Sequence, residues 1–307
     1  MGKLNSYAVV FGSSLAWSSV VVIGGTLVES EGLFTTLTLG LLAGAALMLP
    51  AGLARVKDLM NEELLSSGVL LGLLMGALGL GSLLSALQYI SPFWVLGAAL
   101  CTPLFSAVFN RSETSGGKAV AIMLGYLGLV AMTAGTELLA SRIGGWLLCG
   151  LGVVSLGLGL SHCRVNCQNL SRVGLTFWGA IGAAIFLMPV ACHEPVNVLS
   201  LPLAQFAAAL GLTLALGLGC AGWSWLEGRS RNNEDNQRVL ALTPVLSLIF
   251  LTVMGLDVRG WEVLGLMMVG LALWISGRPE TRPTVELPLP VEFEKQTRMD
   301  FEHRKVA

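Results

Sequence analysis

The chain has 307 residues, of which 54% are hydrophobic and 12% are charged, and its mean hydropathy is +0.75. A soluble domain carries about 25% charged residues, so this composition excludes an ordinary soluble globular protein. The net charge of −1 says nothing about partners, and we expect no nucleic acid among them.

The charged residues sit in short clusters, and the stretches between the clusters reach the length of about 20 apolar residues that a membrane-spanning helix needs. No stretch alternates with a dominant period of two, which favours helices over a barrel. The pattern predicts an all-α integral membrane protein with ten transmembrane helices. In chain order the predicted spans are 8–28, 33–53, 66–88, 92–110, 119–136, 143–161, 174–192, 198–226, 239–256 and 261–276.

The positions of Lys and Arg predict the orientation. With the N-terminus in the cytoplasm, every Lys and Arg except Arg142 and Arg259 falls on the cytoplasmic side. Cytoplasmic loops carry an excess of these residues, so both termini are expected inside. We expect the plasma membrane, the inner membrane in a bacterium.

One short pattern occurs twice. Thr-Pro-x-x-Ser-x-x-Phe begins at Thr102 and again at Thr243, each time in the fourth span of a five-span unit. Because five is odd, the second unit enters the membrane from the opposite side, which predicts two inverted five-helix repeats. The expected organisation is a first repeat at 1–138, a second at 139–277 and a disordered cytoplasmic tail at 278–307, where prolines and balanced charges prevail.

Three stretches carry a resemblance. They are "ALQYISPFWVLGAALCTPLFSAVFNRSETSGGKAVAIMLGYLGLVAM", "LTPVLSLIFLTVMGLDVRGWEVLGLMMVGLALW" and the Trp-containing "SSLAWSSVVVIGG", with acidic residues Glu113 and Asp257 after the two proline helices. Over residues 8–276 the chain resembles the EamA-type drug/metabolite transporter superfamily. The resemblance implies ten helices as two inverted repeats, a central cavity, and movement of small metabolites such as amino acids.

The spans hold no Asp, Glu, Lys or Arg away from their ends, which argues against a buried carboxylate that carries protons. Hydroxyls, one amide and indole rings suit a neutral or zwitterionic solute. The expected pathway residues are Ser14, Trp17, Ser18, Ser82, Ser85, Gln88, Thr102, Ser106, Ser155, Trp178, Thr243 and Ser247. The alternative is structural, because Ser and Thr often bond their own helix and Trp often lies at the membrane interface.

The two motif prolines are expected to act as hinges. Pro103 leaves the carbonyl of Ala99 without its helical hydrogen bond, and Pro244 does the same to Leu240. In lipid such a carbonyl needs protein or a wet cavity as its partner. Packing alone is the other explanation of these prolines. Close packing is also what the four-residue spacing of Gly72 with Gly76, and of Ser155 with Gly159, predicts.

The sequence therefore predicts a transporter that moves small metabolites by alternating access, with export favoured. The alternative is a non-transporting scaffold or accessory subunit with a degenerate pathway. No paired His, Asp or Glu constellation supports catalysis, so no enzyme, metal or cofactor is expected. The partners expected are membrane lipid and a small-molecule solute, and a homodimer is left open.

Overall fold

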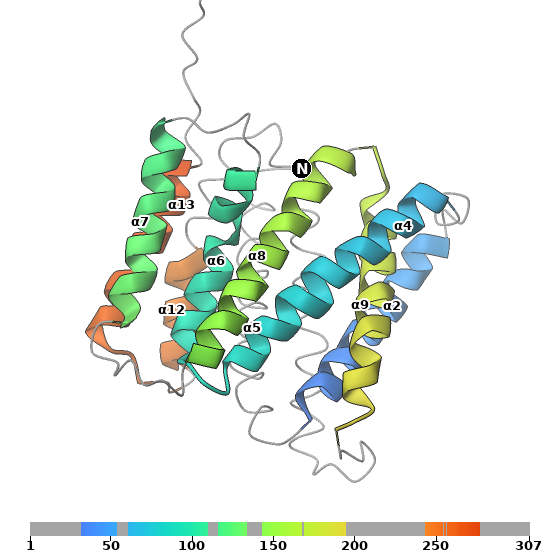
Figure 1. Ribbon diagram of the computed structural model, residues 1–307, viewed down its shortest axis with the longest axis horizontal. Coiled ribbons are helices and arrows are strands. Elements are labelled where there is room, and N and C mark those ends of the chain that lie inside the picture. The colour runs from blue at the N-terminus through green and yellow to red at the C-terminus, as the bar shows by residue number, and fades with distance from the viewer. Residues whose placement is uncertain are drawn as a thin grey trace, which may run out of the picture.

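The computed structural model describes residues 32–53, 61–109, 116–133, 143–167, 169–194, 243–253, 255 and 257–276 (Figure 1). These residues form helices and connecting turns, with no strand among them. The predicted spans 8–28 and 198–226 and the predicted tail 278–307 lie outside the described residues. The other eight spans all contain a helix.

The helices follow the predicted spans closely. α2 has the predicted bounds, and α4 begins earlier than predicted because Asn61 caps its first turn, where its Oδ1 accepts from the backbone N–H of Glu63 at 3.0 Å. The elements are α2 (Leu33–Leu53), α4 (Glu62–Leu71), η1 (Gly72–Leu80), α5 (Gly81–Ala86), α6 (Pro92–Phe109), α7 (Gly116–Thr133), α8 (Ile143–Asn166), α9 (Arg172–Ala191), α12 (Thr243–Val253) and α13 (Gly260–Ser276).

Four helical segments are long and apolar enough to cross a membrane, judged by length and composition. They are Leu33–Pro50, Glu62–Ala86, Ile143–Cys163 and Val173–Ala191. Shorter apolar helical segments lie in α6, α7, α12 and α13. Large apolar side chains are exposed on the outside of these helices, among them Leu147, Met123 and Val253. Such a surface is suited to lipid and indicates a membrane protein.

The predicted span 66–88 is a continuous helical run whose middle, η1, is a π-helix. Glycines let this run approach its neighbours closely. A Cβ on Gly72 would meet the backbone of Gly179 and Ala183 in α9, and a Cβ on Gly79 would lie 2.7 Å from the Leu156 side chain in α8. The expectation that Gly72 and Gly76 serve tight packing is confirmed, and a Cβ on Gly159 would likewise meet Met75.

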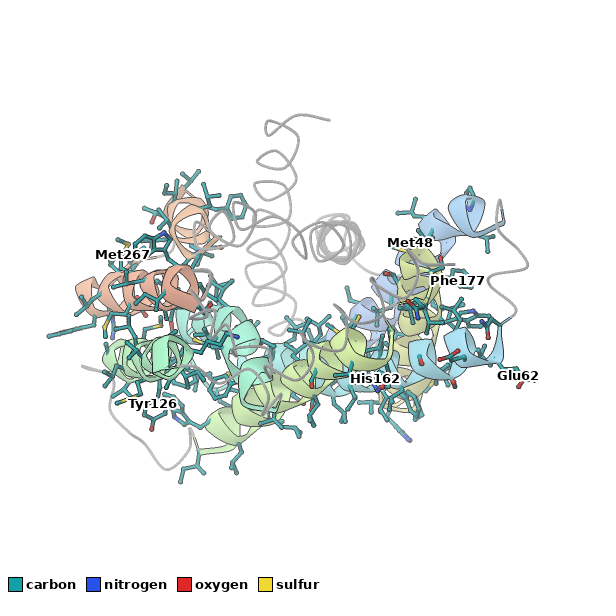
Figure 2. All side chains as sticks on the ribbon, turned by 90° about the horizontal axis from the view of Figure 1, so that it is seen from above. Met48, Glu62, Tyr126, His162, Phe177 and Met267 are labelled. Atoms are coloured by element: carbon teal, nitrogen blue, oxygen red, sulfur yellow. The ribbon has the colours of Figure 1, made fainter. Side chains whose placement is uncertain are left out.

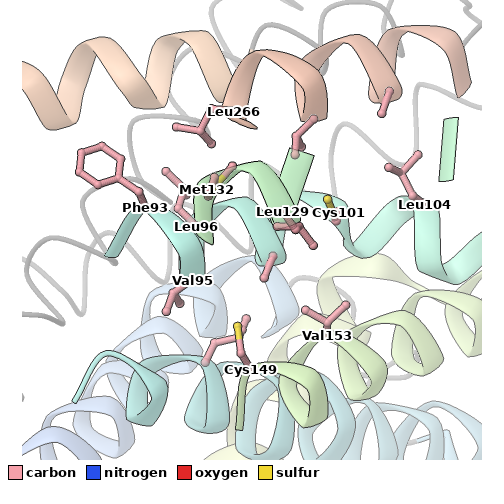
Figure 3. Packing of buried hydrophobic residues seen from close by; sticks show 14 of the residues in the cluster. Phe93, Val95, Leu96, Cys101, Leu104, Leu129, Met132, Cys149, Val153 and Leu266 are labelled. Carbon is pink, nitrogen blue, oxygen red and sulfur yellow. The ribbon is translucent and has the colours of Figure 1, made fainter. Parts of the chain in front are cut away.

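The helices form two groups (Figures 1 and 2). α6, α7, α12 and α13 lie together at one end, where Figure 2 labels Tyr126 and Met267, and α2 and α9 lie at the other end, with Met48 and Phe177. α8 and the α4–η1–α5 run cross the middle and contact each other. The largest apolar cluster joins α5, α6, α7, α8, α12 and α13 and includes Phe93, Leu96 and Leu266 (Figure 3).

Contacts between helix ends define two faces of the molecule. On the first face, Glu194 after α9 bonds the first turn of α2, and Ser91 before α6 bonds Glu262 in the first turn of α13. Tyr89, after α5, lies against Gly145 at the start of α8. We call this the Glu194 face, and the positive-inside pattern predicts that it faces outward.

The opposite face, called the His162 face, carries the start of α4, the end of α8 and the start of α9. Leu64, Cys167 and Leu175 form one buried cluster there. Successive described helices joined by short connections therefore run in alternating directions. In agreement with this, α7 and α13 are antiparallel, because Gly125 lies near Ala272 while Met132 lies against Gly265.

Candidate functional site

The doubled motif places two buried hydroxyls on contacting helices. Thr102 lies in α6 and is 4% exposed, and Ser247 lies in α12 and is 0% exposed. α6 and α12 contact each other, and each comes from a different half of the chain. Neither Thr102 Oγ1 nor Ser247 Oγ has a hydrogen-bond partner. A buried hydroxyl without a partner is costly, so a water or ligand group that reached these atoms would relieve that cost.

A third hydroxyl of this kind was not predicted. Thr38 in α2 is 6% exposed, and its Oγ1 is buried without a hydrogen-bond partner. The sequence signal was available, because Thr38 lies inside the predicted span 33–53. Other hydroxyls are used by their own helices: Ser85 Oγ donates to the Gly81 carbonyl at 2.7 Å and Thr252 Oγ1 donates to the Leu248 carbonyl at 2.8 Å.

The other predicted pathway residues of α5, of the turn after it and of α8 differ in burial. Ser82 in α5 and Ser155 in α8 are buried, and these two elements pack together. Ser155 lies between Gly152 and Gly159, whose Cα atoms face Leu83 and Met75. Gln88 is exposed in the turn after α5. The structure therefore buries Ser82 and Ser155 on two elements that pack together, and it leaves Gln88 at the Glu194 face.

Trp178 lies in the other group of helices. It is half-buried, packs edge-on to Phe177 with ring centroids 5.3 Å apart, and its Cβ lies against Gly68. Ser14, Trp17 and Ser18 lie outside the described residues. The backbones of Pro103, Ser106 and Thr243 are helical, and the positions of their side chains lie outside the described part of the chain.

A second pair of prolines repeats between the halves. Pro50 lies near the C-terminal end of α2, and Pro189 lies near the C-terminal end of α9; both are exposed. The local sequences "LMLPA" and "FLMPV" are similar. α2 and α9 are the second helices of their predicted repeats, just as α6 and α12 are the fourth. The repeat predicted from the Thr-Pro pattern did not include this pair.

The described side chains offer no metal site, since they contain no group of three His, Cys, Asp or Glu residues that could hold one. The carboxylate of Glu194 instead accepts two backbone N–H groups of α2. His162 Nδ1 lies 2.9 Å from Asn166 Nδ2 one helical turn away. Besides the three hydroxyls, His162 Nε2 is the other buried side-chain polar atom without a hydrogen-bond partner among the described residues.

Comparisons with known proteins give the fold alone. No family model and no curated protein matches the chain. A solved crystal structure, described only as "Crystal structure of protein", matches with a TM-score of 0.63 and 19% sequence identity. The match covers 88% of this chain and 97% of that chain. At this identity the likeness shows a shared fold over nearly the whole chain, and the two proteins' activities are not linked by it.

Proposed function

We propose that this protein is a membrane transporter of small neutral or zwitterionic metabolites that works by alternating access between two inverted five-helix repeats. This is the function that the resemblance to EamA-type drug/metabolite transporters implies. Export across the plasma membrane, with both termini in the cytoplasm, is the direction and orientation that we favour.

The pairing of helices supports the repeat. α2 packs on α9, and these are the second predicted helices of the two halves. α7 packs on α13, and these are the fifth. Within each half the fourth and fifth helices also contact each other, α6 with α7 and α12 with α13. A two-fold axis in the membrane plane between the halves requires such pairs of corresponding helices.

The observation that carries the proposal is the set of buried hydroxyls without partners. Thr38 and Thr102 come from the first half, and Ser247 comes from the second. Binding sites of transporters with inverted repeats lie between the repeats, and polar groups there meet the solute. Hydroxyls bind neutral or zwitterionic groups, and the helices that carry these three, α2, α6 and α12, contain no charged residue.

The test compares stability with transport. Thr102→Val and Ser247→Ala remove the hydroxyls with little change in shape. Because an unpaired buried hydroxyl costs about 1–3 kcal/mol, the double variant should melt at the same temperature as the parent or higher. It should also lose solute movement. Metabolite profiling of cells that lack the protein, overexpress it or overexpress the variant, at equal abundance, measures the second effect.

Thr252→Val is the matched control, because the Thr252 hydroxyl already bonds its own helix. This control should leave the metabolite profile unchanged. If the parent and the double variant give the same profile as cells without the protein, the scaffold alternative is correct. If the double variant instead loses stability, its hydroxyls are structural and the site assignment is wrong.

A further inference from the structure

Two carboxylates at the Glu194 face each bond across the two halves of the chain. Glu194 follows α9 in the second half, and its two oxygens accept from backbone N–H groups of α2 in the first half. Glu262 lies in α13 in the second half, and it accepts from the hydroxyl of Ser91 in the first half. Both residues lie at helix ends.

The contact between α9 and α2 is reciprocal. Glu194 Oε1 accepts from Phe34 N at 2.9 Å, and Glu194 Oε2 accepts from Thr35 N at 2.7 Å. In return, Thr35 Oγ1 donates to the carbonyl of Ala191 at 3.2 Å. The first N–H groups and last carbonyls of a helix lack partners within it, and a carboxylate also suits the positive N-terminal end of the helix dipole. Each helix end is therefore satisfied by the other half.

The contact at Glu262 is built differently. Its Oε2 accepts from the backbone N–H of Arg259 at 3.0 Å, which caps its own helix. Its Oε1 accepts from Ser91 Oγ at 3.1 Å, immediately before α6. Glu262 is only 7% exposed, so this bond is shielded from water. One carboxylate thus ties the beginnings of two helices from different halves.

Caps at the His162 face are local by comparison. The N-terminus of α4 is capped by Asn61, and that of α9 by Ser171, whose Oγ accepts from Gly174 N at 3.4 Å. α9 corresponds to α2 in the predicted repeat. Its first turn is thus capped by its own segment, whereas the first turn of α2 is capped by the other half.

We propose that Glu194 and Glu262 form a latch that holds the two halves together at the Glu194 face and parts when that face opens. This inference rests on the alternating-access function proposed above. Hydrogen bonds to charged groups are stronger than those between neutral groups. The bonds of Glu194 and Glu262 to the first half would all break if the two halves separated at this face. Weakening them shifts the equilibrium toward the state open at the Glu194 face.

The experiment places a cysteine behind the latch. Thr38→Cys, in the full-length chain with its own cysteines replaced by alanine, puts a thiol at a buried position of α2, one turn beyond Thr35. The rate of its reaction with a maleimide is measured in purified protein in detergent, where the orientation in the membrane does not matter. Glu194→Gln, which keeps the shape and removes the charge, should raise this rate about tenfold, equivalent to about 1.4 kcal/mol.

Further variants separate the two contacts. Glu262→Gln should raise the rate as well, and the double variant should raise it more than either. Ser91→Ala should raise the labelling rate less than Glu262→Gln does. It removes only the bond between the halves and leaves the bond from Arg259 N–H to Glu262. Glu63→Gln is the control, since this exposed carboxylate lies in the first turn of α4 at the His162 face. The control should leave the rate unchanged.

Two outcomes overturn the latch. One is an unchanged labelling rate at position 38 in the double variant. The other is an equal rise at Cys149, kept as the single cysteine in a parallel variant, because Cys149 is 1% exposed in the large core cluster and reports general unfolding. Neither measurement uses a solute. If labelling responds as expected but no metabolite is moved, the latch stands and the proposed transport function fails.

Discussion

Gly128 of α7 and Gly265 of α13 meet backbone to backbone. A Cβ on Gly128 would lie 2.7 Å from the carbonyl oxygen of Gly265, and a Cβ on Gly265 would lie 2.5 Å from the carbonyl oxygen of Gly128. The relationship is mutual, which is what the proposed inverted repeat expects of two corresponding helices that cross near its axis. Small residues at such crossings let helices approach closely in lipid.

Substituting either glycine should therefore destabilise the protein. We expect Gly128→Ala and Gly265→Ala each to cost about 1–3 kcal/mol, because overpacking forces the helices apart. Thermal melting in detergent measures the change. Gly150→Ala in α8 is the matched control: a Cβ there meets nothing within 4 Å, and alanine favours a helix by about 1 kcal/mol. A control variant as unstable as Gly128→Ala would contradict this account.

Labelling from the two sides of the membrane should confirm the faces. Cys192 is exposed just after α9 at the Glu194 face, and Glu62 is exposed at the start of α4 at the His162 face. A chain whose single cysteine is Cys192 should react with an impermeant maleimide in intact cells. Glu62→Cys, in a chain without other cysteines, should react only in inverted vesicles. Reaction of both positions from the same side would remove the inverted repeat.

Trp94 should contribute a hydrogen bond that phenylalanine cannot replace. Its Nε1 donates to the carbonyl of Leu129 at 3.0 Å, which ties α6 to α7, and its ring packs edge-on to Trp146 with centroids 3.9 Å apart. Trp94→Phe should lower the free energy of unfolding by about 1 kcal/mol more than the loss of packing alone would. Comparison with Trp146→Phe, by melting temperature, isolates the bond. Equal losses in the two variants would mean that packing alone matters.

The motif prolines should affect movement more than stability. Pro103 lies inside α6 and removes one backbone hydrogen bond from it, so alanine there should restore a regular turn. Pro244 lies in the first turn of α12 as the structure describes it, where a helix has no such bond to lose. Under the hinge hypothesis, Pro103→Ala and Pro244→Ala keep their abundance and melting temperature but lose most transport, with opposite bias between the two open states. Accessibility of Thr38→Cys in each variant measures the bias. Two variants that transport like the parent would leave these prolines as remnants of duplication.

Much of the helical framework was predictable from the sequence, because apolar length and flanking charges mark where a chain can span lipid. This gave the bounds of α2 and came within a few residues for α6 and α9. The earlier start of α4 was also readable, since Asn61 precedes Glu62 and Glu63 in a capping pattern. The π-helix η1 could not be predicted from the sequence. Its glycines are compatible with a π-helix, but the contacts that accompany it are made with α8 and α9, which are distant in the sequence.

Residues that act across long separations could not be predicted in the same way. Glu194 contacts Phe34 at a sequence separation of 160 residues, and Ser91 contacts Glu262 at a separation of 171. No local sequence pattern predicts such a contact, because it depends on which helix ends lie together at one face. By contrast, Thr38 and the Pro50–Pro189 pair carry local signals in the sequence: Thr38 is a hydroxyl inside a predicted span, and the prolines are a second repeated feature of the two halves.

The meeting of Gly128 with Gly265 also has a consequence for the order in which the protein matures. The ribosome makes α7 long before α13, and α2 long before α9. Each early helix therefore enters the bilayer without the partner that its glycines or leucines fit. N-terminal segments fold first during synthesis, yet the crossing of α7 with α13 forms only once Gly260–Ser276 has been made. A ribosome stalled before residue 260 would leave Gly128 of α7 without the α13 backbone that it packs against.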